Sequence, residues 1–184
     1  MTFRNTTRYW GVLSKALHWI IVLLIINQWW IAGRAESLPL GTAKLQAIGL
    51  HKSFGMTILA LAILRLVWRW LNPVPTLDGL AKSWERKLAS LSHVLLYGLI
   101  FAIPLSGWLM SSARNFPVSW FGLFQFPDLV GADKSLYDLM HDLHGLLFAA
   151  LVIVALMHIA GALKHHFIDK NEVLRRMLPF GGVK

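Results

Sequence analysis

Residues 144–158 read HGLLFAALVIVALMH, with a histidine at each end and 13 residues without a polar side chain between them. This stretch belongs to an apolar run at 140–163, and similar runs occur at 16–33, 47–68 and 90–112. Each run is long enough for an α-helix to cross a hydrocarbon core about 30 Å thick. The pattern predicts an all-α membrane protein in which residues 1–184 form a single domain, an antiparallel bundle of four transmembrane helices.

The composition agrees with a membrane protein. Hydrophobic residues make up 56% of the chain, which is too apolar for a soluble domain with a surface facing water. The chain has no cysteine, which excludes disulfides, thiolate nucleophiles, iron–sulfur clusters and covalently attached haem. The first apolar run lacks a small-residue cleavage site, so we expect a retained span and not a signal peptide.

The net charge of +9 is distributed unevenly along the chain. If the N-terminus is cytoplasmic, 13 of the 18 lysines and arginines face the cytoplasm, but only four of the nine acidic residues do. This is the positive-inside distribution, and it predicts that both termini are cytoplasmic. A basic inner face also suits anionic lipid headgroups. We therefore expect membrane lipid, and not nucleic acid, as a partner.

Four of the eight histidines are predicted to lie inside the spans at two depths. His18 and His158 lie near the inner ends of the first and fourth spans, and His51 and His144 lie near the outer ends of the second and fourth. The 14 residues from His144 to His158 advance a helix by about 21 Å and leave the two side chains within about 40° of each other. One helix thus directs two imidazoles toward one interior. Polar groups at membrane depth are usually functional, although a single histidine can simply form an interhelical hydrogen bond.

Two imidazoles from different helices at one depth can bind the iron of a haem b from both sides without covalent attachment. Two such levels predict two b haems per chain and an electron path across most of the bilayer. His93 lies in the third span at the depth of His18, so spacing alone leaves open which of the two pairs with His158. Glycines in the spans, including Gly107, can leave room for a haem, although close helix packing is their more frequent role.

Other functions for these histidines remain open from the residues alone. A zinc site needs three or four clustered ligands, usually including carboxylates, and the spans contain almost no Asp or Glu. A transporter could use the histidines to relay metal ions or protons. His165 and His166 follow the fourth span, where solvation at the membrane surface is their ordinary role, and His141 lies beside two aspartates at the external mouth.

The chain resembles the bacterial cytochrome b561 family over nearly its whole length. The motifs that carry the resemblance are His18-Trp19, Leu50-His-Lys-Ser-Phe-Gly55, Ser106-Gly-Trp108, the spacing of 14 from His144 to His158, Ala162-Leu-Lys-His-His-Phe-Ile-Asp-Lys170 and Arg175-Arg-Met177. The resemblance implies that His18 pairs with His158 and His51 with His144 as haem ligands. It also implies a multi-pass protein of the bacterial inner membrane that exchanges electrons with ubiquinone.

One type in this family is similar to a superoxide oxidase. We therefore expect a dihaem cytochrome that transfers electrons between a periplasmic donor, with superoxide as the candidate, and ubiquinone. Lys52 and Arg114 are candidates for attracting the superoxide anion, and His93 and His165 are candidates for quinone contacts. The alternative is a haem-bearing membrane anchor that passes electrons between a separate dehydrogenase or hydrogenase and the quinone pool.

Overall fold

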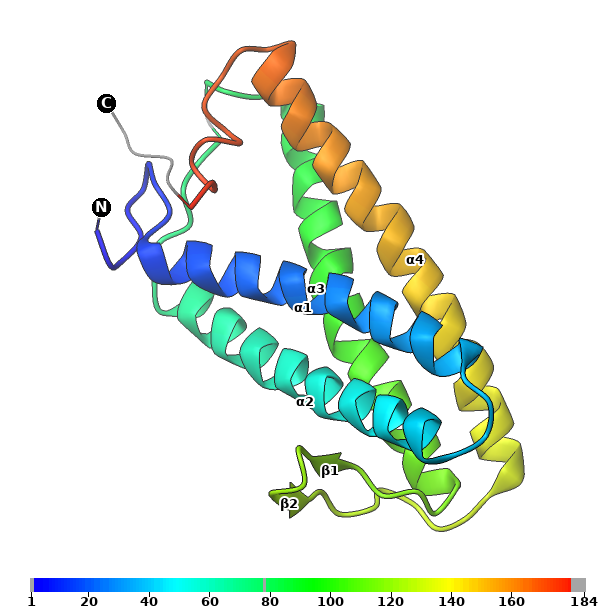
Figure 1. The fold of residues 1–184 in the computed structure, drawn as a ribbon. Helices are drawn as coiled ribbons and strands as arrows, with labels where there is room; N and C mark the ends of the chain where they lie inside the picture. The colour runs from blue at the N-terminus through cyan, green and yellow to red at the C-terminus, as the bar shows by residue number, and fades with distance from the viewer. Residues whose placement is uncertain (1, 78, 180–184) are drawn as a thin grey trace.

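A computed structural model describes residues 2–77 and 79–179 of the chain (Figure 1). Four long helices dominate it: α1 (Val12–Ser37), α2 (Thr42–Trp70), α3 (Ser83–Ala113) and α4 (Lys134–Phe167). Each contains an apolar stretch long enough to cross a membrane. The four predicted spans are therefore present, each as the middle of a longer helix. Residues 1, 78 and 180–184 of the predicted domain lie outside the described residues.

Polar residues and prolines set the helix boundaries. Asp133 caps α4, because its side chain accepts a hydrogen bond from the Leu136 amide at 3.0 Å. At the start of α3, the Glu85 carboxylate accepts the Lys82 amide at 2.8 Å. Residues 83–88 form the first turns of α3. The sequence Asn72-Pro73 follows α2 directly, where a proline cannot continue a helix.

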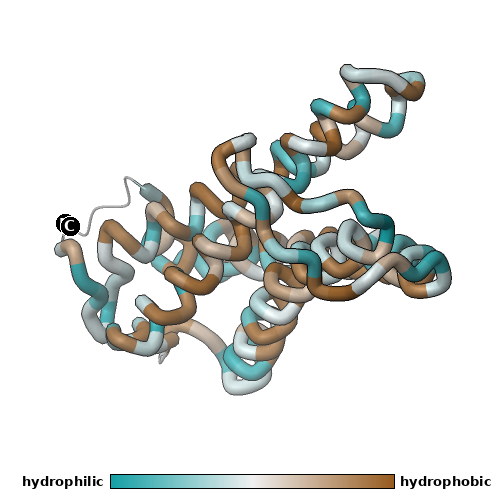
Figure 2. Tube along the Cα trace, turned by 90° about the horizontal axis from the view of Figure 1, so that it is seen from below, coloured by the Kyte–Doolittle hydropathy of each residue, from teal (hydrophilic) through white to brown (hydrophobic). Residues whose placement is uncertain are grey.

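The helices form two antiparallel hairpins, α1–α2 and α3–α4, which are joined through contacts of α2 with α3. In the view of Figure 1 the two hairpins cross at a large angle. Large apolar side chains cover much of the helix surface, among them Leu23, Trp29, Leu146 and Ile153, all more than half exposed. Figure 2 shows many hydrophobic positions along the helices. A lipid environment satisfies such a surface, because hydrocarbon replaces water around it.

The connection from α3 to α4 contains the one departure from an all-helical fold within the described residues. Strands β1 (Ser119–Trp120) and β2 (Phe124–Gln125) pair antiparallel, with Ser119 opposite Gln125 and Trp120 opposite Phe124. The turn between them holds Gly122 at φ 75°, a conformation that glycine adopts without steric cost. Val118 of this connection packs with Met56 and Leu59 of α2 in the described hydrophobic core.

The two ends of the bundle differ in what covers them. We call the end that carries β1, β2 and residues 114–133 the hairpin end. The other is the termini end, where residues 2–11, 71–77, 79–82 and 168–179 meet. There the Thr76 amide donates to the Thr7 carbonyl at 3.1 Å, and the Trp19 indole donates to the Met177 carbonyl at 2.9 Å. Both described ends of the chain therefore lie on the same side of the bundle.

Candidate haem sites

Helix α4 carries one histidine toward each end of the bundle, and each faces a histidine from the α1–α2 hairpin. His158 faces His18 of α1, with ring centroids 6.5 Å apart and ring planes at 71°. His144 faces His51 of α2, with centroids 6.2 Å apart and planes again at 71°. We call these the termini-end pair and the hairpin-end pair. The structure thus brings together the four histidines that the sequence placed at two levels.

The geometry of each pair fits one metal ion between its two rings. A metal–nitrogen bond of about 2.0 Å to each imidazole places the two ring centres roughly 6 Å apart. The ring planes can take any mutual angle, because each ring rotates about its own metal–nitrogen bond. The donors are imidazole nitrogens within apolar helices, with no cysteine in the chain. This donor set suits the iron of a b haem with two axial histidines.

In each pair, the histidine of α4 faces a histidine of the other helix hairpin. Among the described residues, no Cα atom of α4 comes within 8 Å of one in α1 or α2. Among the described residues, the hairpins are in close backbone contact through α2 and α3, and α2 also contacts β1 of the connection between α3 and α4. The imidazoles of α4 therefore reach across to the α1–α2 hairpin instead of filling a tight helix–helix contact.

The Nδ1 atoms of the hairpin-end pair have different surroundings. His144 Nδ1 lies 3.0 Å from the Ser106 hydroxyl of α3. His51 Nδ1 is buried and has no hydrogen-bond partner among the described residues. The same is true of Gln28 Oε1. The Gln28 amide nitrogen donates to the His51 carbonyl at 2.8 Å. Buried polar atoms without partners are uncommon and often mark a site for a cofactor or ion.

His93 of α3 lies against the termini-end pair. Its ring centroid is 5.2 Å from that of His158, with the planes at 62°. This is an edge-to-face contact between neighbouring rings, and it is about 1 Å shorter than the separations in the two pairs. The termini end therefore gathers three imidazoles, of which His18 and His158 have the spacing that suits a metal between them.

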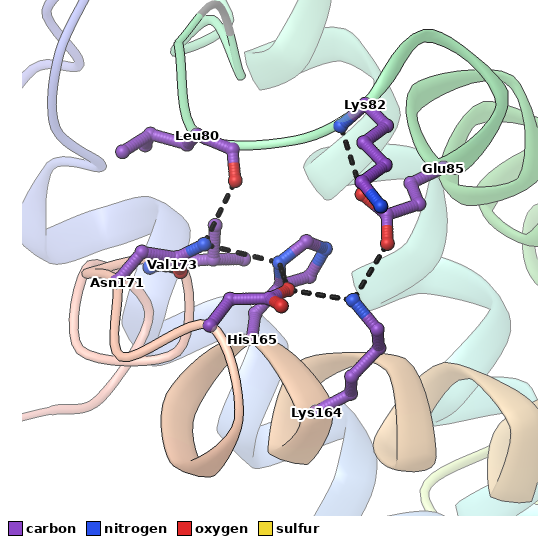
Figure 3. Close-up of polar contacts among 8 residues, drawn as sticks. Leu80, Lys82, Glu85, Lys164, His165, Asn171 and Val173 are labelled. Carbon is purple, nitrogen blue, oxygen red and sulfur yellow. Dashed lines mark hydrogen bonds and ion pairs between the residues drawn. The ribbon is translucent and has the colours of Figure 1, made fainter.

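A second polar cluster lies at the termini end, where α3 begins and α4 ends (Figure 3). The Lys164 ammonium donates to Glu85 at 2.6 Å and to Asp169 at 2.7 Å. His165 Nδ1 lies 2.9 Å from Asp169 and 3.1 Å from the Asn171 amide nitrogen. His165 is buried, so the ordinary expectation of a solvated surface histidine is wrong for this residue.

The Lys164 ammonium occupies the position that a metal ion would take in this cluster. Glu85, His165 and Asp169 place ligand atoms within 4.8 Å of one another, which is close enough for a metal ion. The Lys164 ammonium, however, contacts both carboxylates and supplies the positive charge that they require. Glu85 is also a buried carboxylate in the first turn of α3, before the predicted span 90–112. The geometry is that of a hydrogen-bonded ion-pair network.

The two basic residues that we expected near the hairpin end both have partners there. The Lys52 ammonium donates to the Phe116 carbonyl at 2.7 Å and lies 3.3 Å from the centre of the Phe116 ring. Arg114 donates to the Tyr137 hydroxyl at 2.6 Å. Lys52 therefore ties the α3–α4 connection to α2, while Arg114 remains exposed at the end of α3.

His141 lies apart from both pairs. Its side chain is 64% exposed, and its Nδ1 is 3.4 Å from the neighbouring Asp142 carboxylate. Asp138 forms an exposed ion pair with Lys134 at 2.6 Å. These residues therefore have the surface surroundings that the sequence suggested for them.

Sequence reasoning assigned no role to Ser106 or Gln28, and it named Gly107 only among the glycines that can leave room for a haem. Ser106 and Gly107 contact the His144 ring, and Gln28 contacts the backbone of His51. The available signal was a serine or glutamine inside an apolar span, since such a residue must find a partner there. The sequence does not say which partner it finds.

Comparisons with known proteins place these features in a family context. The family model described as prokaryotic cytochrome b561 matches residues 9–180. Cytochrome b561 homolog 2 of Escherichia coli K12 is 35% identical over 179 residues, which cover 97% of this chain and 95% of the relative. The "Probable superoxide oxidase CybB" of Yersinia pestis is 28% identical, covering 92% of this chain and 96% of the relative. Cytochrome b561 homolog 1 of Escherichia coli K12 is 26% identical, covering 89% and 93%.

Proposed function

The chain belongs to the prokaryotic cytochrome b561 family, and from that premise we propose that its two histidine pairs hold two b haems. Membership makes it a multi-pass electron-transfer protein of the bacterial inner membrane that carries b-type haem. In our proposal His18 and His158 bind one haem iron, and His51 and His144 bind the other. The observation that carries the assignment is the distance between ring centroids, 6.5 Å in the pair His18–His158 and 6.2 Å in the pair His51–His144.

When bound, haem supplies a centre that gains and loses one electron. The residues of the chain determine which chemistry is possible there. With two imidazoles of the chain holding each iron, the group would supply electron transfer and not oxygen activation. The apolar helices exclude water from the pairs. His144 and His158 lie on one helix, 14 residues or about 21 Å apart along its axis, which places the two centres at different depths.

We propose further that electrons pass from superoxide at the hairpin end to ubiquinone at the termini end. The name of the Yersinia pestis relative supports the donor. Two superoxide anions each lose one electron and become O₂, while one ubiquinone gains two electrons and two protons and becomes ubiquinol. The termini end faces the cytoplasm in this proposal, since it carries most of the basic residues. Arg114, exposed at the hairpin end, provides positive charge for an anionic donor, and Lys52 adds to it.

The proposed quinone contacts are His93 and His165. Both belong to the termini end, where the Asp169 carboxylate holds His165 through Nδ1 at 2.9 Å. An imidazole held in this way can pass a proton through its other ring nitrogen. Asp169 also contacts Lys164, so the proton donor lies within an ion-pair network at the membrane surface.

Haem content of the purified protein tests the proposal. The wild type should contain two haems per chain by the pyridine haemochrome assay, with ligand-deficient variants each retaining one. His18→Ala and His158→Ala should lose the same haem, and His51→Ala and His144→Ala the other, as judged by the remaining spectrum. His141→Ala, the surface control, should retain both. A folded His51→Ala protein with two unaltered haems contradicts the pairing, and stable co-purification of a dehydrogenase or hydrogenase supports the membrane-anchor alternative.

A further inference from the structure

We propose that Ser106 and Gly107 of α3 position the His144 imidazole as an iron ligand. Ser106 fixes the ring in the tautomer that leaves Nε2 free to bind metal, and Gly107 leaves the space that the ring needs. The inference rests on the proposed haem-binding function of His144. It assigns a role to two neighbouring residues that do not themselves bind the haem iron.

The hydrogen bonds of Ser106 determine the tautomer. Its hydroxyl donates to the Ile103 carbonyl at 2.8 Å, one turn earlier in α3. A hydroxyl has one proton, so in this proposal Ser106 uses it on Ile103 and accepts from His144 Nδ1 at 3.0 Å. His144 therefore carries its proton on Nδ1, and the lone pair is on Nε2. That is the form in which a histidine binds a metal through Nε2 while its other nitrogen is held by a partner.

Gly107 fixes the position of the same ring from the adjacent residue. A Cβ atom at position 107 would lie 3.1 Å from His144 Cε1 and 3.4 Å from Nδ1. The first distance is shorter than an ordinary carbon–carbon contact, so any larger residue would push the ring away by a few tenths of an ångström. The backbone of α3 can approach His144 this closely only because residue 107 has no side chain.

Loss of the hydrogen bond between Ser106 and His144 should affect only one haem. Among the hydrogen bonds of the described residues, the bond between His144 Nδ1 and Ser106 is the one that joins the ring of a paired histidine to a side chain of another helix. Its counterpart His51 has a buried Nδ1 without a partner in the part of the chain that the structure describes. A hydrogen bond from Nδ1 to an acceptor makes the imidazole a stronger electron donor and stabilises oxidised iron. Removing the acceptor should therefore raise the reduction potential of the hairpin-end haem and leave the termini-end haem unchanged.

The first test replaces Ser106 in the haem-loaded full-length protein. Ser106→Ala should shift the midpoint potential of one of the two haems upward in a redox titration, with two haems retained. Ser106→Thr, which keeps the hydroxyl, should restore the wild-type value. Ser92→Ala is the matched control. Ser92 of the same helix donates to the Ala89 carbonyl at 2.9 Å, with the same three-residue spacing, and its loss should move neither potential.

The second test uses Gly107 and does not depend on how the serine variants fold. Gly107→Ala should change the low-temperature electron paramagnetic resonance g-values of one haem, because the His144 ring must turn or move. Gly98→Ala is the control, since a Cβ at position 98 in the same helix meets nothing within 4 Å. It should give the wild-type spectrum.

The outcomes separate this inference from the proposed function. A wild type with two haems, in which Ser106→Ala and Gly107→Ala leave both potentials and both sets of g-values unchanged, overturns the positioning role and leaves the haem assignment intact. A wild type without haem overturns both. A shift confined to the haem that is lost in His144→Ala supports the inference. A shift confined to the other haem contradicts it.

Discussion

The hairpin end and the termini end of this bundle each hold a pair of facing histidines, but their surroundings have different chemistry. At the hairpin end, His144 is held by a neutral serine hydroxyl, and Lys52 is tied to backbone carbonyls of the covering connection. At the termini end, a third imidazole from His93 contacts the pair. The ion-pair network of Glu85, Lys164, Asp169 and His165 lies at the same end.

This difference matches the two half-reactions that we propose. Oxidation of superoxide removes one electron and moves no proton, so it requires only a fixed electron acceptor and an attractive field for an anion. Reduction of ubiquinone takes up two protons with its two electrons. Proton transfer needs titratable side chains in hydrogen-bonded contact with one another, and the termini end supplies them in His165 and Asp169.

Among the substitutions that test this difference between the two ends, a change of Asp169 should have the largest effect. Asp169→Asn removes the carboxylate that holds His165 and should lower ubiquinone reduction on the order of 10²-fold, the usual contribution of a positioned acid or base. Haem reduction by superoxide should be unchanged, since that step takes up no proton. Stopped-flow absorbance at the haem band separates the two steps.

Asp138→Asn is the matched control for this experiment. Asp138 is also a carboxylate paired with a lysine, but it is exposed at the start of α4 near the hairpin end. It should leave both steps unchanged. If Asp169→Asn reduces quinone at the wild-type rate, the termini-end network has no role in proton delivery.

The four spans were predictable because a membrane-crossing helix needs only a long apolar run. Their ends were not predictable from hydropathy. The helix α4 extends from Lys134 to Phe167, beyond the predicted run 140–163 at both ends, because Asp133 caps it and the aqueous turns carry polar residues. The small sheet of β1 and β2 was also missed, since strands of two residues have no periodicity to detect.

For the paired histidines, helix geometry predicted only the common direction of His144 and His158, while the family resemblance, and not the spacing, selected His18 over His93 as the partner of His158. The 14-residue spacing fixes the direction of His144 and His158 from helix geometry alone. The residues around them could not be found in this way, since their partners are remote in sequence. Ser106 contacts a residue 38 positions away, and Glu85 contacts one 79 positions away. Such contacts depend on how α3 packs against α4, which no local pattern specifies.

A smaller effect is expected from the charge at the hairpin end. Arg114→Gln removes an exposed positive charge and should slow reaction with superoxide about threefold at low ionic strength, because steering of an anion depends on nearby cations. The difference from wild type should shrink as salt rises to about 0.15 M. Pulse radiolysis measures this rate directly.

Arg8→Gln is the control for the charge experiment. Arg8 is also exposed but lies at the termini end. Its loss should not slow superoxide oxidation at any ionic strength. A slower reaction in Arg8→Gln than in Arg114→Gln would place the anion at the termini end and reverse the proposed direction of electron flow.

The termini-end pair gives a subtler prediction about His93. His93→Leu should keep both haems, since the 5.2 Å ring contact leaves no room for a metal between His93 and His158. It should shift only the absorption band of the termini-end haem, because His158 loses a neighbouring imidazole. Difference spectra at low temperature resolve the two bands. Loss of one haem in His93→Leu, with both retained in His18→Ala, would exchange the roles of His18 and His93.

The smallest effects compare two tryptophans that tether opposite ends. The Trp19 indole donates to the Met177 carbonyl at 2.9 Å, and the Trp108 indole donates to the Pro127 carbonyl at 3.1 Å. Replacing either by Phe removes one hydrogen bond, with a cost of about 1 kcal/mol to the local segment. Amide hydrogen exchange should then accelerate roughly fivefold in the tethered segment alone. That segment is 171–179 for Trp19→Phe and 123–131 for Trp108→Phe, whereas Trp29→Phe, at an exposed position, should change neither. Faster amide exchange at both ends in either variant would mean that the two ends unfold locally as one cooperative unit, although their side chains differ in chemistry.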